Sequence, residues 1–245
     1  MSTTATPDTG SLAPPRVKST STGQNDARVF ASRHPISRWY LYPLATRLAD
    51  ALAPTRARPT HLTLCGLVAA LGAVAWLVCF PARAPWAAAP ILLAWFFDRT
   101  DGLLARRQAT VSPRGAWLDA NLDELIDLGL QIAVASAAAT RTGTAWPWGL
   151  LIAFLAGKYL FLHGLREENA QEDSSSKSKQ EESPRRGLTK WLYHLPGNAD
   201  IRLHALVVMV LFGWLTAELA AVALYYNLRW IARYGLVVQR LEGPR

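Results

Sequence analysis

The stretch that begins at residue 98 reads Asp98-Arg-Thr-Asp101-Gly102-Leu-Leu-Ala105-Arg106, then eight residues, then Gly115-Ala-Trp-Leu-Asp119-Ala-Asn-Leu-Asp123. Its four aspartates recur at helical spacing inside segments that are otherwise apolar enough to lie in a membrane. Ionisable side chains are costly in a bilayer and usually mark a functional site. The stretch therefore predicts membrane helices that carry a charged site.

The composition favours an all-α integral membrane protein. The chain has 245 residues, of which 51% are hydrophobic, and a formal net charge of +8. Lys and Arg do not cluster on a soluble domain, which argues against nucleic acid as a partner. Six apolar segments are each close to the ~20 residues that cross the hydrocarbon layer. The six predicted transmembrane helices are Leu62–Phe80, Trp86–Gln108, Gly115–Thr140, Trp146–Leu165, Ile201–Leu215 and Leu219–Val238.

The polar and amphipathic segments divide the rest of the chain. Residues 1–35 are rich in Ser, Thr and Pro and hold little to bury, so we expect this segment to be disordered. Apolar residues recur every four positions in Ile36–Ala53, which predicts an interfacial amphipathic helix before the first span. The Ser, Lys and Glu-rich stretch at about 167–190 predicts a flexible cytoplasmic loop. The membrane domain is therefore expected to cover residues 36–240.

Basic residues predict the orientation of these helices. They gather in the N-terminal segment, the turn between the second and third spans, the loop after the fourth span and the C-terminal end. The loops on the other side carry only Arg83 and Arg141. By the positive-inside rule, both termini are cytoplasmic. We expect the bacterial cytoplasmic membrane, with the charged site facing the cytoplasm.

The spacing of the aspartates predicts a metal site. Asp98 and Asp101 share one helix face, and so do Asp119 and Asp123 on the next helix. A tight turn between these helices would point the two faces at each other, where unneutralised carboxylates repel strongly. Hard oxygen ligands suit Mg²⁺ or Mn²⁺. One divalent cation, or a pair, would relieve the repulsion.

Small residues and an arginine lie beside the aspartates. Gly102, Ala105 and Gly115 leave space for a ligand or for the neighbouring helix. Arg106 ends the first motif helix, and its planar guanidinium suits phosphate oxygens. Two metal ions that clamp a phosphoryl group are an established solution for displacement at phosphorus. We therefore interpret the stretch as a pyrophosphate site.

The pattern D-x2-D-G-x2-A-R-x8-G-x3-D-x3-D resembles the signature of the CDP-alcohol phosphotransferase (CDP-alcohol phosphatidyltransferase) family, and every position is matched. The resemblance covers about residues 36–240 and includes Pro59-Thr-His-Leu-Thr63 at the entry to the first span. It implies a metal-dependent enzyme with a dinuclear Mg²⁺ or Mn²⁺ site, a CDP-linked lipid as donor and a small alcohol or alcohol phosphate as acceptor. CMP would be released. A homodimer is a candidate assembly by the same resemblance.

The resemblance also implies roles for individual residues. Asp98, Asp101 and Asp119 resemble ligands of the dinuclear metal site. Asp123 resembles a ligand of the second metal and the general base that takes the proton of the acceptor hydroxyl. Contact with the CDP moiety, or a place in the lining of its pocket, is implied for Thr60, Thr63, Gly102, Ala105, Arg106, Ser112 and Gly115.

Charged residues outside the pattern have more than one interpretation. Asp127 extends the face of Asp119 and Asp123 by one turn and could tune the site, pair with a basic residue or line the acceptor cavity. Glu124 is interpreted as an interhelical partner. Basic residues in or near the last three spans either hold a phosphorylated acceptor or anchor the helices at the cytoplasmic face. They are Lys158, Arg202, Arg229 and Arg233, with Arg202 as the leading candidate.

Two other functions remain open at this point. The same family chemistry can use CDP-choline or CDP-ethanolamine as donor and diacylglycerol as acceptor, although the short chain favours CDP-diacylglycerol as the donor. A divalent-cation transporter would instead distribute its acids through the depth of the membrane. The acidic motif clusters near one face, which favours the transferase of phospholipid biosynthesis.

Overall fold

The computed structural model describes residues 35–175 and 198–241, and over these residues the protein is helical without a strand. This confirms the predicted all-α class and places a helix on each of the seven segments for which one was predicted. In chain order the elements are α2 (Ser37–Leu52), α3 (Pro59–Cys79), the short 3-10 helix η1 (Pro81–Ala87), α4 (Ala88–Arg107), α5 (Pro113–Thr142), α6 (Trp146–Ser175), α8 (Ala199–Leu211) and α9 (Leu215–Leu241).

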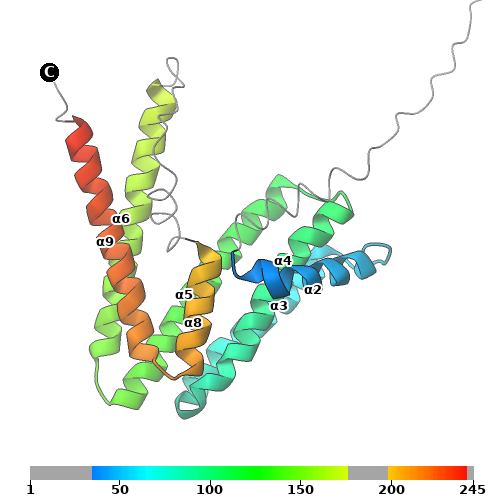
Figure 1. The fold of residues 1–245 in the computed structure, drawn as a ribbon, viewed down its shortest axis with the longest axis horizontal. Helices are drawn as coiled ribbons and strands as arrows, with labels where there is room; N and C mark the ends of the chain where they lie inside the picture. Colours follow the sequence, from blue (N-terminus) through cyan, green and yellow to red (C-terminus); the bar gives the residue numbers. More distant parts are fainter. Residues whose placement is uncertain (1–34, 176–197, 242–245) are drawn as a thin grey trace, which may run out of the picture.

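The helices form two groups joined by α5 (Figure 1). On one side α3 packs against α4, and α2 lies on α4. On the other side α6 and α9 lie side by side, as Figure 1 shows. α5 connects the two groups, because it contacts α3 in the first and both α6 and α9 in the second. α8 also contacts α4 on one side and α9 on the other.

Small residues allow the helices to approach closely. The main core is centred on α5, which buries a run of mostly small side chains, namely Ala133, Val134, Ala135, Ala137 and Ala138. Small residues at helix interfaces are typical of membrane helix bundles. A second cluster places Ala45 and Ala49 of α2 against Leu103 and Leu104 of α4. This second cluster holds α2 against the helix that carries the first half of the aspartate motif.

The described helices differ in their suitability for a membrane. Among the described residues, α3 alone is long and apolar enough to be a candidate for crossing a membrane by length and composition. Charged side chains interrupt the apolar character of α4 and α5. α8 has 13 residues and therefore rises about 20 Å, less than the ~30 Å of a hydrocarbon layer. The six-span topology thus stays a prediction.

Several predicted boundaries differ from the structure, and the largest difference lies at the end of the fourth predicted span. The fourth predicted span ends at Leu165, whereas α6 continues to Ser175. Residues 167–175, predicted as part of a flexible loop, are therefore helical. The first six of these residues include three Glu, one Gln and one Ala, which favour helix even without an apolar face. The rest of that loop to residue 190, and the predicted disordered segment up to residue 34, lie outside the described residues.

The close packing of α6 on α9 gives a test of the fold. A Cβ atom on Gly157 would lie 2.7 Å from Asn227 Nδ2 and 3.0 Å from the Asn227 backbone nitrogen. Asn227 cannot move freely, because its Nδ2 donates to the carbonyl oxygens of Ala153 and Ala223, both at 2.8 Å. We expect Gly157→Ala to lower the free energy of unfolding by about 1–3 kcal/mol, as overpacked cores do. Thermal unfolding of the purified protein in detergent would measure it.

Gly149→Ala is the matched control on the same helix, because a Cβ at Gly149 would meet no atom of residues 35–175 and 198–241 within 4 Å. Alanine favours helix over glycine by about 1 kcal/mol, so the control should be neutral or stabilising. Equal melting temperatures for the two variants would contradict the close contact between α6 and α9.

Candidate functional site

The two halves of the aspartate motif meet because α4 and α5 share a third helix. α4 and α5 both pack against α3, and each of them contacts α3 more extensively than it contacts the other. The approach of α3 to α4 is close at Gly66, where a Cβ would lie 3.3 Å from the carbonyl oxygen of Ala94. Gly66 and Ala94 both line the pocket into which the aspartates point. The absence of a side chain at Gly66 therefore keeps α3 and α4 close directly beneath the site.

A tight turn after α4 reverses the chain, as the sequence predicted. The Thr110 N–H donates to Ala105 O at 2.9 Å, and Ala109 lies between them with φ of +52°. A non-glycine residue in this left-handed region costs about 1 kcal/mol. α5 then begins at Pro113, with the Ser112 hydroxyl oxygen accepting from Gly115 N at 3.1 Å as an N-cap. Ser112 thus starts the helix that carries the second half of the motif.

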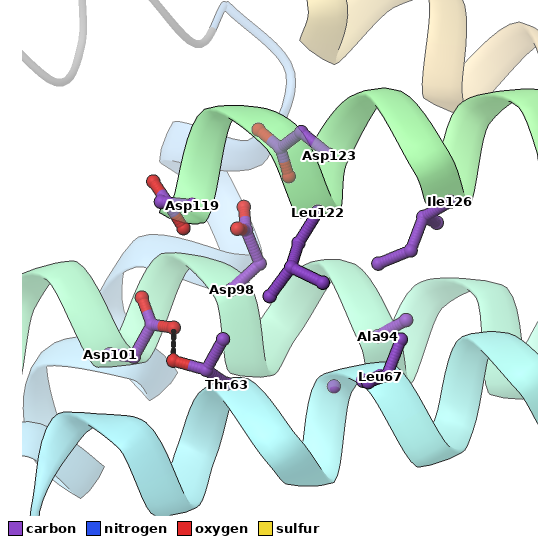
Figure 2. A pocket seen from close by; sticks show the side chains of 10 residues that line it. Thr63, Leu67, Ala94, Asp98, Asp101, Asp119, Leu122, Asp123 and Ile126 are labelled. Carbon is purple, nitrogen blue, oxygen red and sulfur yellow. Dashed lines mark hydrogen bonds between the residues drawn. The ribbon is translucent and has the colours of Figure 1, made fainter. Parts of the chain in front are cut away.

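Three carboxylates converge above this turn. One oxygen each from Asp98, Asp119 and Asp123 lies within 4.8 Å of the others, and Figure 2 shows these side chains turned toward one another. Asp98 is half-buried, whereas Asp119 and Asp123 are exposed. Two like charges about 5 Å apart repel by about 3 kcal/mol at the effective dielectric of a protein surface. The arrangement therefore favours a bound cation.

Asp101 lies in the same pocket but is held differently. It is only 6% exposed, and its Oδ2 lies 2.5 Å from the Thr63 hydroxyl of α3, the contact drawn as a dashed line in Figure 2. The aspartate and threonine side chains thus tie α4 to α3 at the floor of the site. The pocket is lined by Thr63, Gly66, Leu67, Ala94, Asp98, Asp101, Asp119, Leu122, Asp123 and Ile126.

The donor set fits a divalent metal. All the converging atoms are carboxylate oxygens, which Mg²⁺ and Mn²⁺ prefer. Ligand oxygens about 2.1 Å from a single Mg²⁺ can be about 4.2 Å apart at most. A spread of up to 4.8 Å therefore suits either one ion after a small side-chain adjustment or two ions that share ligands. Asp98, Asp119 and Asp123 are the residues that could hold such ions, with Asp101 beside them.

The remaining predicted residues lie at the same end of the molecule. Thr63 lines the pocket itself, and Thr60 is exposed in the first turn of α3. A Cβ on Gly102 would lie 3.8 Å from Arg106 Nη1, so the guanidinium extends back over the glycine one turn before it. A Cβ on Gly115 would lie 3.1 Å from Ser112 Oγ, which gives this glycine a part in the cap as well. Ala105 is half-buried on α4. Their contacts to a nucleotide stay predictions.

The structure places Arg99 beside the candidate metal site. From the sequence, Arg99 was only one of several basic residues near the turn. Arg99 Nη2 lies 3.1 Å from Asp98 Oδ2. Its Cζ lies 3.8 Å from the centre of the Trp95 ring, a close cation–π contact. Trp95 and Arg99 are four residues apart on α4, and this spacing is the signal that could have indicated the contact.

A second charged cluster lies one turn further along α5. Lys158 Nζ of α6 lies 2.6 Å from Asp127 Oδ2 and 2.7 Å from Glu124 Oε1. Arg202 Nη2 of α8 lies 3.5 Å from Asp127 Oδ1, and Arg202 also donates to the Tyr226 hydroxyl. Of the interpretations of Asp127, pairing with basic residues is confirmed. Glu124 is confirmed as an interhelical partner.

The other two basic candidates lie against aromatic rings. Arg229 donates to the Tyr225 hydroxyl, and its Cζ lies 4.4 Å from the centre of the Phe161 ring. Arg233 Cζ lies 5.8 Å from the centre of the same ring. Contacts of this kind stabilise a guanidinium inside a helix bundle without requiring a ligand.

Comparison with known proteins agrees with the geometry. Residues 56–238 match the family model of CDP-alcohol phosphatidyltransferase. The "Bifunctional IPC transferase and DIPP synthase" of Aquifex aeolicus (strain VF5) is 29% identical over 145 residues, which are 57% of this chain and 30% of that protein. The chain thus aligns with less than a third of the length of this relative. Because the family model covers most of the chain, including all four aspartates, the protein belongs to the CDP-alcohol phosphatidyltransferase family, whose members transfer phosphate-containing groups from CDP-alcohols.

Proposed function

We propose that this protein is an integral-membrane transferase of phospholipid biosynthesis. It moves the phosphatidyl group of CDP-diacylglycerol to a small alcohol or alcohol phosphate and releases CMP. The observation that carries this proposal is the convergence of Asp98, Asp119 and Asp123 within 4.8 Å, in a chain of this family. The membrane domain responsible is residues 36–240.

The residues of the pocket divide the chemistry between them. Asp98, Asp101, Asp119 and Asp123 would hold two Mg²⁺ or Mn²⁺ ions, and these ions would neutralise the diphosphate and stabilise CMP as the leaving group. Arg106 pairs with phosphate oxygens, with Gly102 leaving the space for them. Thr60, Thr63, Ala105, Ser112 and Gly115 border the nucleotide. Asp123, exposed at the edge of the pocket, accepts the proton of the acceptor hydroxyl. The acceptor oxygen then bonds to the phosphorus as the bond from that phosphorus to CMP breaks.

The surface of the described residues supports a membrane location, which we propose to be the bacterial cytoplasmic membrane. Large apolar side chains lie on the outside, such as Val68, Ile152 and Leu224, each more than 60% exposed. An apolar exterior of this extent needs a lipid or a partner to cover it. The basic loops favour six spans with both termini and the active site facing the cytoplasm. The homodimer stays a prediction.

The second charged cluster supports a phosphorylated alcohol as acceptor. Asp127 follows Asp123 by one helical turn, so the cations that pair with it, Lys158 and Arg202, lie about one turn along α5 from the proposed general base. A guanidinium and an ammonium in this position suit a phosphate group. Asp127 and Glu124 keep these cations paired when an acceptor is absent.

The first test is the overall reaction. With CDP-diacylglycerol, Mn²⁺ or Mg²⁺ and a panel of alcohols and alcohol phosphates, the purified protein should release CMP only when both a metal and one of the acceptors are present. A chelator should abolish the release, because the pocket carboxylates would then repel the diphosphate. Product formation would be followed by separating CMP from the CDP-lipid.

A lack of CMP release with every acceptor would contradict CDP-diacylglycerol as the donor. In that case release from CDP-choline or CDP-ethanolamine with diacylglycerol as acceptor would indicate the other branch of the same family chemistry. Metal transport without any CMP release would instead favour the cation transporter, against which the gathering of the acids in one pocket argues.

The second test addresses the general base. Asp123→Asn keeps a similar shape and an oxygen ligand but cannot accept the proton, so turnover should fall at least about 100-fold while the CDP-lipid still binds. Turnover would be measured as CMP release and binding by competition with a labelled CDP-lipid. Asp50→Asn is the control, because Asp50 is an exposed acid on α2 that pairs with Arg107 at 2.7 Å, a surface pair of small energetic weight. Near-normal turnover of Asp123→Asn would remove Asp123 from this role.

The third test addresses the acceptor. Arg202→Ala should raise the KM for the acceptor several-fold more than the KM for the CDP-lipid. Arg202→Lys retains the charge but not the planar fork, so its KM for the acceptor should lie between those of the wild type and Arg202→Ala. Steady-state kinetics with each substrate varied in turn would separate the two constants. Equal rises in both would assign Arg202 to the support of the helix bundle rather than to the acceptor.

A further inference from the structure

A buried carboxylate joins the start of α8 to the start of α2. Asp200 is completely buried, and its Oδ2 accepts from the backbone N–H groups of Ile36 at 2.7 Å and Ser37 at 3.1 Å. Its Oδ1 accepts from the Ser37 hydroxyl. A carboxylate at a helix N-terminus is favoured by the unpaired N–H groups and by the helix dipole. Asp200 therefore holds both the backbone and the side chain of Ser37 in one position.

Ser37 connects Asp200 to α4 through a hydrogen bond with Trp95. Because its hydroxyl hydrogen is given to Asp200, its oxygen is oriented to accept, and it accepts from Trp95 Nε1 at 3.1 Å. Ser37 itself has no exposed surface, so its end of this hydrogen bond is shielded from water. A shielded bond restricts the plane of the indole ring more firmly than an exposed one would.

The indole ring in turn lies against the metal site. Arg99 stacks on Trp95 at 3.8 Å and contacts Asp98 Oδ2 at 3.1 Å. Arg99 Nε is buried and has no hydrogen-bond partner among the described residues, and this end of the side chain contacts the Trp95 ring and the Asp98 carboxylate. Asp98 is one of the three carboxylates that converge. An unbroken series of contacts thus runs from the buried Asp200 to a predicted metal ligand.

We propose that Ser37, Trp95 and Arg99 form a positioning chain that orients Asp98 for metal binding and is anchored by Asp200. The proposal rests on the proposed metal site and adds to it a link between that site and α2, the predicted interfacial helix. Groups that hydrogen-bond to metal ligands orient them, and their loss commonly lowers metal affinity 10–100-fold. Ser37 and Trp95 act through Arg99 and are positioning residues rather than catalytic ones.

The test measures Mn²⁺ binding directly, by electron paramagnetic resonance of free Mn²⁺ titrated against the full-length protein in detergent. Trp95→Phe keeps a ring under Arg99 but loses the bond to Ser37, and Ser37→Ala loses the same bond together with the bond from the Ser37 hydroxyl to Asp200. Each should raise the Kd for Mn²⁺ about tenfold. The double variant should raise the Kd no further than Ser37→Ala alone, because Ser37→Ala has already broken the bond that Trp95→Phe removes. CMP release should recover at high Mn²⁺ concentration.

Trp76→Phe is the matched control. Trp76 also uses its indole N–H in one hydrogen bond, to the Arg83 carbonyl oxygen at 2.9 Å, but it lies on α3 next to η1, outside the chain of contacts. The Trp76→Phe variant should lose stability in thermal unfolding to a degree similar to Trp95→Phe, while its Kd for Mn²⁺ stays at the wild-type value. That pattern would support positioning rather than a general loss of stability.

Two results would overturn the positioning chain alone: wild-type Mn²⁺ affinity in Trp95→Phe, or an equal loss of affinity in Trp76→Phe. If the wild-type protein binds no Mn²⁺, the positioning chain and the proposed metal site both fail. The wild-type titration therefore distinguishes the failure of this inference from the failure of the proposed function.

Discussion

Mutual repulsion of like charges is the constraint that the rest of the structure has to meet. The carboxylates of Asp98, Asp119 and Asp123 approach within 4.8 Å although each would be more stable apart from the others. Packing holds them there. α4 and α5 are both packed on α3, and the missing side chain of Gly66 lets α3 approach α4 directly beneath the pocket. The folded helices thus supply the proximity, and a cation would remove the repulsion that the proximity creates.

α5 contributes to two charged clusters that differ in their net charge. Asp119 and Asp123 turn toward Asp98 on α4, whereas Asp127, one turn further, turns toward Lys158 on α6 and Arg202 on α8. The first cluster is an excess of negative charge, and in the second the basic side chains balance the acids. This change along one helix separates an uncompensated acidic cluster from a cluster whose charges are paired. It follows from the position of α5 between the two groups of helices.

Local sequence signals predicted much of this arrangement. The periodicity of Ile36–Ala53 corresponds to α2, and the aspartate spacing places each pair on one helix face. The boundaries were predicted less well where no apolar pattern existed. Residues 167–175 are helical because of their propensity for helix, which an apolar pattern does not report. The fifth span was predicted to reach Leu215, but α8 ends at Leu211, just before the left-handed Gly213.

The sequence by itself determined the helical class, the family and the four aspartates, because periodicity and fixed spacing are properties of the chain alone. Only the tertiary structure decided which groups surround those aspartates. Thr63 and Asp101 are hydrogen-bonded although they are 38 positions apart in the sequence, and Asp200 and Ser37 are hydrogen-bonded across 163 positions. Such contacts depend on how helices far apart in sequence pack on one another. No local pattern encodes that packing, because it is the sum of many small contacts across the whole bundle.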